Sequence, residues 1–225
     1  MVVAGPRSRE LLATLTDAPL DNASFPWRSA QEIEIAGVRT LALRINYVGE
    51  LGWELHPKMA DLATLYNAVW AAGEAHGIAN FGLYALNSLR MEKAYRGWGA
   101  ELTNEVTMLE ADMARFFNDK KDDFIGKLAT ETRDTGPLQL VYFSVDAVDA
   151  DVRGGEPIFV GDDCVGVTTS GGYGHAVEQS LGFGYVPPAQ AIPGSVLEVG
   201  LLDARCQATV LTDPAYDPAN QRLMS

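Results

Sequence analysis

The sequence predicts an α+β region followed by a small six-stranded antiparallel β-barrel. Two observations support this fold class. Up to about residue 135, apolar residues spaced as on one face of a helix occur between short runs of alternating apolar residues. After residues 134–137 (DTGP) the helical spacing disappears, and short β-rich runs separated by turn residues follow. We therefore expect two domains, residues 1–135 and residues 136–225.

Local patterns predict the elements of the first region. A proline in a first turn, an aspartate before an apolar helical run and a Thr-x-x-Glu sequence are signals of helix starts, whereas alternation indicates a strand. The expected elements, in order, are a helix over 6–16, a hairpin over 31–47 that turns at Ala36-Gly37, an extended segment over 53–55, a helix capped by Asp61 and ending near Gly77, a helix over 82–93, a short helix opened by the Thr107 and Glu110 capping box, and a helix over 123–133.

Six β-rich runs predict the strands of the second region. They lie within about 75 residues, a spacing typical of a small closed barrel. Gly161-Asp162 and residues 201–203 are expected as hairpin turns. The expected strands cover residues 138–145, 157–160, 164–170, 181–186, 196–200 and 204–211.

Composition and charge exclude several classes of protein. Of the 225 residues, 47% are hydrophobic, which is too many for a disordered chain. No apolar run approaches the roughly 18 residues that a membrane-spanning helix needs. Lys and Arg number 17 against 30 Asp and Glu, so the net charge is −13. Because such a surface repels phosphate backbones and anionic lipids, we expect neither nucleic acid nor membrane as a partner.

The two cysteines and the chain start allow two further expectations. Cys164 and Cys206 lie in expected strands without a CxxC pair, so we interpret them as ordinary buried thiols of a cytoplasmic protein. Residues 1–5 (MVVAG) resemble the end of a strand and lead directly into a helix start. We interpret this abrupt start as a sign that upstream residues are missing.

One glycine-rich segment, residues 47–55, has the residue types of a heterocycle site. Glu54 stands between aromatic residues, including Tyr47 and Trp53. Aromatic rings offer stacking to a flat, amide-like heterocycle, and a carboxylate accepts its paired N–H donors. The alternative interpretation is a tight turn with a surface glutamate.

Other polar segments are less specific. Arg90 and Arg96 are placed to bind a ligand carboxylate, or to form ordinary surface ion pairs. Residues 168–175 (TTSGGYGH) match neither a P-loop nor a dinucleotide fingerprint. The histidines are scattered, so we expect no metal site, and no nucleophile signature indicates catalytic residues.

Four segments in order resemble the folate-binding region of the glycine-cleavage T-protein family, and most of all the C-terminal part of dimethylglycine and sarcosine dehydrogenases. This resemblance implies a folate-binding α+β region followed by a six-stranded barrel. It also implies tetrahydrofolate as ligand and capture of a methyl-derived carbon as methylenetetrahydrofolate. No flavin-binding segment is recognised here, so FAD is expected only in a missing domain or a partner chain. The segments are 47–55 (YVGELGWEL), 89–101 (LRMEKAYRGWGAE), 123–127 (DFIGK) and 167–186 (VTTSGGYGHAVEQSLGFGYV).

The resemblance also implies roles for individual residues. Glu54 falls on the family's pterin-binding glutamate, with Tyr47 beside it, and Arg90 is a candidate for the glutamate tail of the folate. Leu86 and Gln139 stand where T-proteins have arginines, which favours the dehydrogenase branch. The family's aspartate that acts at the folate nitrogen lies upstream of this chain, so no catalytic residue is expected here.

Three alternatives remain open from the sequence. The first is an aminomethyltransferase or another folate-dependent demethylase with a different methyl donor. The second is a non-catalytic, truncated binding or assembly module. A homodimer is the third, because a missing half would leave apolar surface exposed.

Overall fold

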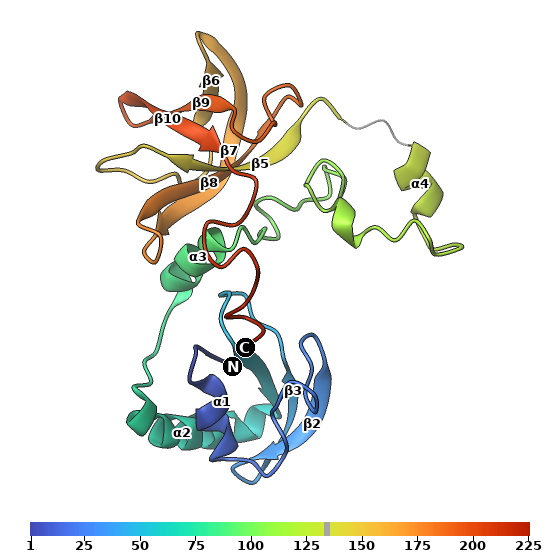
Figure 1. The fold of residues 1–225 in the computed structure, drawn as a ribbon, viewed down its shortest axis with the longest axis vertical. Coiled ribbons are helices and arrows are strands. Elements are labelled where there is room, and N and C mark those ends of the chain that lie inside the picture. The colour runs from blue at the N-terminus through green and yellow to red at the C-terminus, as the bar shows by residue number, and fades with distance from the viewer. Residues whose placement is uncertain (133–135) are drawn as a thin grey trace. The chain divides into compact units, whose positions relative to one another are not determined.

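The computed structural model describes residues 1–132 and 136–225, which form two compact units (Figure 1). The N-terminal unit comprises Met1–Leu86 and Asp217–Ser225, and the barrel unit comprises Asn87–Tyr216. The expected boundary after residue 135 lies at the edge of the segment outside the described residues.

An antiparallel sheet in the order β1-β4-β3-β2 organises the N-terminal unit. The hairpin of β2 and β3 confirms the prediction, since Ala36 and Gly37 form its turn with φ of 50° and 76°. Strand β1 covers the expected strand end and lies at the sheet's edge. The elements are β1 (Val2–Ala4), α1 (Ser8–Ala13), β2 (Ala30–Ile35), β3 (Val38–Leu43), β4 (Gly52–Pro57), α2 (Leu62–Gly73) and the start of α3 (Leu83–Glu92).

Helix α2 begins and ends near the expected residues, with one difference. Asp61 occupies the N-cap position but makes no side-chain capping hydrogen bond, because it ends a short 3-10 helix, Met59–Asp61. The predicted cap by the Asp61 side chain is therefore wrong. At the other end, a 3-10 turn over Glu74–His76 stops at Gly77, whose φ of 72° is the left-handed conformation that glycine adopts readily.

The core of the N-terminal unit lies on one face of the sheet. Trp53 and Leu55 of β4 are fully buried there, against Leu65 and Val69 of α2. Because side chains alternate along a strand, Glu54 points to the opposite face. Its backbone pairs with Val2 of β1 and with Leu43 of β3.

The C-terminal tail, Asp217–Ser225, completes the N-terminal unit. Leu223 is 3% exposed. The buried Arg44 guanidinium donates to the carbonyl oxygens of Phe25, Met224 and Ser225 at 2.7, 3.5 and 3.1 Å. These bonds tie the last residues of the chain to the loop that follows β3.

Six antiparallel strands close a barrel in the order β10-β5-β8-β7-β6-β9, which confirms the predicted fold class. Strand β7 runs through the glycine-rich segment, four residues beyond its expected end at Ser170. Glycine permits close packing here: a Cβ on Gly182, opposite Gly171, would lie 2.6 Å from the Phe143 ring. The strands are β5 (Gln139–Val145), β6 (Pro157–Val160), β7 (Asp163–Gly174), β8 (Gln179–Val186), β9 (Val196–Leu201) and β10 (Ala204–Val210).

The segment between α3 and the barrel is less helical than expected. Thr107 N and Oγ1 each donate to the Glu110 carboxylate at 2.6 Å, but turns follow instead of the predicted helix. Asp112, with a left-handed φ of 53°, interrupts the helical backbone two residues later. The next helices are a 3-10 turn, Ala114–Phe116, and α4, Lys127–Thr132; the expected helix end at Arg133 lies outside the described residues.

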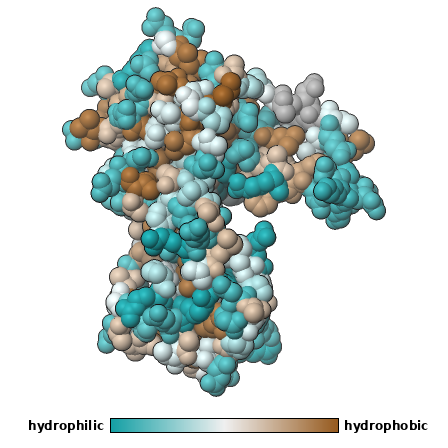
Figure 2. All heavy atoms as spheres, viewed as in Figure 1, coloured by the Kyte–Doolittle hydropathy of each residue, from teal (hydrophilic) through white to brown (hydrophobic). Residues whose placement is uncertain are grey.

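The surface is mixed in polarity. Figure 2 shows hydrophilic side chains interspersed with smaller apolar groups on the face in view. Cys164 is exposed and Cys206 half-buried, and both are free. The expectation of two buried thiols is therefore wrong for Cys164, which lies next to the turn between β6 and β7. No helix within the described part of the chain is long and apolar enough to cross a membrane.

Candidate ligand-binding site

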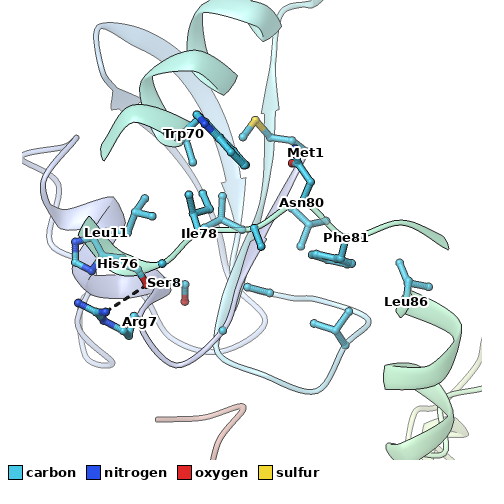
Figure 3. Close-up of a pocket in the computed structure, with 18 of the residues that line it drawn as sticks. Met1, Arg7, Ser8, Leu11, Trp70, His76, Ile78, Asn80, Phe81 and Leu86 are labelled. Atoms are coloured by element: carbon cyan, nitrogen blue, oxygen red, sulfur yellow. Dashed lines mark hydrogen bonds between the residues drawn. The ribbon is translucent and has the colours of Figure 1, made fainter. Parts of the chain in front are cut away.

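A cavity of about 680 Å³ lies within the N-terminal unit (Figure 3). Small-molecule sites commonly measure about 300–1,000 Å³, so this cavity has the volume for a ligand of that class. It is lined by the edge strand β1 and by Tyr66, Val69 and Trp70 of α2, and the chain between α2 and α3 forms a further wall. Tyr47 and Glu54 both contribute to the lining, so the structure brings these two predicted residues together.

Glu54 presents a carboxylate to the cavity. Its side chain is 30% exposed. Oε2 lies 3.2 Å from Nε2 of His56, two residues along the same face of β4. Among the described residues this is the only hydrogen-bond partner of the carboxylate, so Oε1 is available to a donor on a ligand.

Tyr47 lies in the loop between β3 and β4, which Asn46 holds in shape. The Asn46 Oδ1 atom accepts hydrogen bonds from the backbone of Val48 at 3.0 Å and of Gly49 at 2.9 Å. Its amide nitrogen donates to the Glu50 carbonyl oxygen. This local network places Tyr47 and Val48 in the cavity lining.

Trp53 does not border the site, contrary to the sequence-based expectation. It is fully buried on the core face of β4, where its ring packs edge-on against Phe25 at 6.2 Å. The guanidinium groups of Arg9 and Arg44 lie 5.8 and 5.7 Å from its ring centre. Trp53 and Glu54 face opposite sides of the sheet because they are neighbours on a strand, and the Trp53 ring is fully buried among Phe25, Arg9 and Arg44.

Other aromatic residues line the cavity instead. Tyr66 and Trp70 stack on α2 at 6.1 Å, with 20° between their rings. Asn80 donates a 2.9 Å hydrogen bond to the Tyr66 hydroxyl. Phe81, the next residue in the sequence, also lines the cavity. Tyr66 and Trp70 are four residues apart, which indicates a shared helix face, but only the folded structure shows what that face borders.

Arg7 supplies a cation that no sequence motif indicates as a binding residue. Figure 3 shows Arg7 beside His76 at one end of the lining. Its guanidinium donates to the carbonyl oxygens of His76 at 3.3 Å and Ala75 at 3.5 Å, and lies 3.5 Å from the Glu10 carboxylate. The Arg7 side chain is 54% exposed.

Arg90 lies in the barrel unit and is not part of this lining. It is 5% exposed. Both Nε and one terminal nitrogen donate to Asn87, at 3.0 and 2.8 Å. The remaining bonds reach Tyr95 O at 3.1 Å, Glu101 Oε2 at 3.1 Å and Ser170 Oγ at 2.8 Å. These bonds favour a structural role, and a role in holding a folate tail stays a prediction.

Arg96 is also part of a buried arrangement. Its side chain is 8% exposed and pairs with Asp112. Burial lowers the pKa of the Arg96 guanidinium, which lies 5.4 Å from the Phe183 ring centre. The alternative interpretation of Arg90 was an ordinary surface ion pair. Arg90 does pair with Glu101, but both side chains are buried, so this pair does not lie at the surface.

The remaining polar groups show no further site of the expected kinds. Within residues 1–132 and 136–225, no three His, Cys, Asp or Glu side chains are grouped so that they could hold a metal ion. His175 is exposed and packs against Tyr173, with 5.1 Å between the ring centres.

Comparisons with known proteins cover almost the whole chain. Residues 1–121 match the GCVT N-terminal domain, and residues 139–217 match the glycine cleavage T-protein C-terminal barrel domain. The mitochondrial dimethylglycine dehydrogenase of Mus musculus is 41% identical over 98% of this chain and 26% of its own length. The mitochondrial sarcosine dehydrogenase of Mus musculus is 32% identical, over 98% and 25%. The aminomethyltransferase of Listeria welshimeri is 31% identical, over 97% and 60%.

A solved structure shows the same fold. The glycine cleavage system aminomethyltransferase T from Bartonella henselae superimposes with a TM-score of 0.82 at 22% identity, covering 96% of this chain and 59% of its own. The chain thus spans about a quarter of the length of the dehydrogenases and about 60% of that of the aminomethyltransferases.

Proposed function

Because this chain belongs to the glycine cleavage T-protein family, we propose that the cavity of its N-terminal unit binds tetrahydrofolate. The matches to both T-protein domain families confirm the family that the sequence motifs resemble. The observation that supports the ligand is the Glu54 carboxylate, which borders the cavity with Oε1 open to a donor.

The residues present fit such a ligand. A carboxylate accepts the paired N–H donors of an amino-pyrimidinone ring, and these charge-assisted bonds are the stronger kind. We assign this contact to Glu54, with Tyr47 shaping the slot beside it. Tyr66, Trp70 and Phe81 offer apolar surface to the rest of a flat ligand.

The proposed reaction is the capture of a methyl-derived carbon as methylenetetrahydrofolate. This reaction would need a methylated amine that has already been oxidised to an iminium, chemistry that a flavin held outside these 225 residues would supply. Transfer of that carbon is then redox-neutral: two C–N bonds to the folate nitrogens form, the C=N bond to the amine breaks, and the two folate N–H protons pass to the released amine and to solvent. The higher identity to dimethylglycine dehydrogenase, 41% against 31% for an aminomethyltransferase, favours this chemistry. We assign no catalytic residue to this chain.

A second candidate is aminomethyl transfer or another folate-dependent demethylation, supported by the 60% length match to aminomethyltransferases. Turnover assays with different methyl donors separate the two, whereas folate binding without any turnover supports a binding module. A homodimer and a cytoplasmic location stay predictions.

Titration calorimetry with tetrahydrofolate tests the proposal on the whole chain. We expect wild type to bind and Glu54→Gln to bind at least about tenfold more weakly, because hydrogen bonds to a charged group contribute about 1.5–3 kcal/mol. Glu34→Gln, an exposed glutamate outside the cavity lining, is the matched control and is expected to leave the affinity unchanged. Equal affinities of wild type and Glu54→Gln reject the Glu54 role, and absence of binding to wild type rejects the folate site.

A further inference from the structure

We infer that Arg7 binds the carboxylate end of the ligand in this cavity. The inference rests on the proposed function, in which the cavity binds a folate. It names a binding residue that neither the sequence motifs nor the resemblance indicate. The class of ligand group is a carboxylate, such as the glutamyl tail of a folate.

Arg7 is held in place while keeping donors available. Its guanidinium is oriented by long hydrogen bonds to the carbonyl oxygens of Ala75 at 3.5 Å and His76 at 3.3 Å, in the 3-10 turn that follows α2. A guanidinium has five N–H donors, and three are used by these carbonyls and by Glu10. One N–H on each terminal nitrogen therefore remains for a carboxylate, which binds well to such a paired arrangement.

Arg7 is the only Arg or Lys side chain in the cavity lining, within the part of the chain that the structure describes. Two other arginines of this unit have partners outside the cavity lining: Arg44 donates to the Phe25 carbonyl oxygen, and Arg39 pairs with Glu32 at the surface. Arg90, the candidate from the sequence, has its donors satisfied within the barrel unit.

The net negative charge of the chain means that an anionic ligand needs a positively charged side chain at its binding site. The chain carries a net charge of −13, which repels an anionic ligand. Glu10 competes for Arg7 only weakly, since it lies 3.5 Å away and is 65% exposed. A ligand carboxylate that binds the two terminal nitrogens therefore meets only weak competition from Glu10, which is bonded to Nε.

Glu54 and Arg7 together give the cavity two contacts of opposite polarity. Glu54 accepts hydrogen bonds, whereas Arg7 donates them and carries a positive charge. A ligand with donors at one end and a carboxylate at the other therefore binds in one orientation only.

Two probes and one substitution test this inference by calorimetry on the whole chain. The probes are tetrahydrofolate and a tetrahydropterin that lacks the aminobenzoyl-glutamate tail. We expect Arg7→Ala to weaken tetrahydrofolate binding about tenfold and to leave the affinity for the tail-less pterin unchanged, because only the tail contacts Arg7. Added salt should weaken tetrahydrofolate binding to wild type more than to Arg7→Ala.

Three further variants sharpen the test. Arg39→Ala removes an exposed arginine of the same unit outside the cavity and should change neither affinity. Arg7→Lys keeps the charge and should retain part of the binding, whereas Glu10→Gln removes the competitor and should tighten tetrahydrofolate binding about twofold.

The outcomes separate this inference from the proposed function. Unchanged tetrahydrofolate affinity of Arg7→Ala, or equal loss of both probes, overturns the Arg7 role. If tetrahydrofolate still depends on Glu54 in that case, the folate proposal stands alone. If wild type binds neither probe, the proposed function fails and the Arg7 inference fails with it.

Discussion

Two glutamates, one in each unit, carry the same functional group in opposite surroundings: one carboxylate is buried and fully hydrogen-bonded, and the other is partly exposed. Glu101 in the barrel unit is fully buried and accepts bonds from Arg90, from Gly97 N at 2.7 Å, from Thr169 at 2.6 Å and from Ser170 at 2.5 Å. The Glu54 side chain in the N-terminal unit is 30% exposed, and among the described residues its carboxylate hydrogen-bonds only to His56. A carboxylate whose acceptor positions are filled stabilises the fold, whereas one with an open oxygen is available to a ligand.

The Glu101 network connects segments that are distant in the sequence. Through Arg90 and Ser170 it joins helix α3 to strand β7, and Tyr185 of β8 donates to the Glu101 carbonyl oxygen at 2.8 Å. All of these residues belong to the barrel unit. The network therefore fixes α3 against the barrel strands.

Removal of Glu101 should have the largest effect. Glu101→Ala leaves Arg90 as a buried, uncompensated charge, so we expect the free energy of unfolding of the barrel unit to fall by about 3–5 kcal/mol. Urea unfolding followed by circular dichroism measures it. The double variant Arg90→Met/Glu101→Leu should lose much less, and a loss below about 1 kcal/mol for Glu101→Ala contradicts the structural role.

Alkaline pH should weaken the same network by a smaller amount. Burial raises the pKa of Tyr185 to about 12 from its ordinary 10.0, with the Glu101 charge as the second cause. Below pH 10.0 this contribution to stability is fully present, and it is lost as the pH rises toward about 12. The loss is measured by urea unfolding of wild type and Tyr185→Phe, each below pH 10.0 and again at a pH close to 12. If the stability of Tyr185→Phe falls with pH as much as that of wild type, ionisation of Tyr185 is not the cause.

His56 should have a modest effect on ligand binding. His56→Ala removes the one described partner of Glu54, and an exposed pair contributes up to about 1 kcal/mol, so we expect tetrahydrofolate affinity to fall at most about fivefold. His56→Gln keeps a donor and should restore most of it. Calorimetry compares the two variants, and identical losses for both would argue against positioning of Glu54 by His56.

The smallest effect expected is that of Glu54→Gln on stability. Because the side chain is partly exposed and has one partner, the free energy of unfolding should change by no more than about 0.5 kcal/mol. Thermal unfolding in the absence of ligand tests this. A loss comparable to that of Glu101→Ala would remove the distinction between the two carboxylates.

The sequence predicted what depends on neighbouring residues. The hairpin turn at Ala36-Gly37, the barrel strands and the placement of Tyr47 with Glu54 all arise from local patterns. The opposite orientation of Trp53 was also predictable, since adjacent residues on a strand face opposite sides.

Long-range packing explains what the sequence did not predict. Arg90 lies 80 residues from its partner Ser170, so its burial depends on the closed barrel. Arg7, at the start of α1, and Tyr66, on α2, lie far apart in the sequence and line the same cavity only because the two elements pack together. Neither periodicity nor a short motif carries information about such contacts.

The tail that completes the N-terminal unit has a consequence for synthesis. The chain leaves this unit at Leu86 and returns to it only at Asp217, after the whole barrel has been made. On the ribosome, the sheet and the cavity walls emerge long before Leu223 and the carbonyl groups that Arg44 binds. Until translation has passed the last barrel strand, the N-terminal unit therefore lacks Leu223 and two of the three carbonyl groups that Arg44 binds.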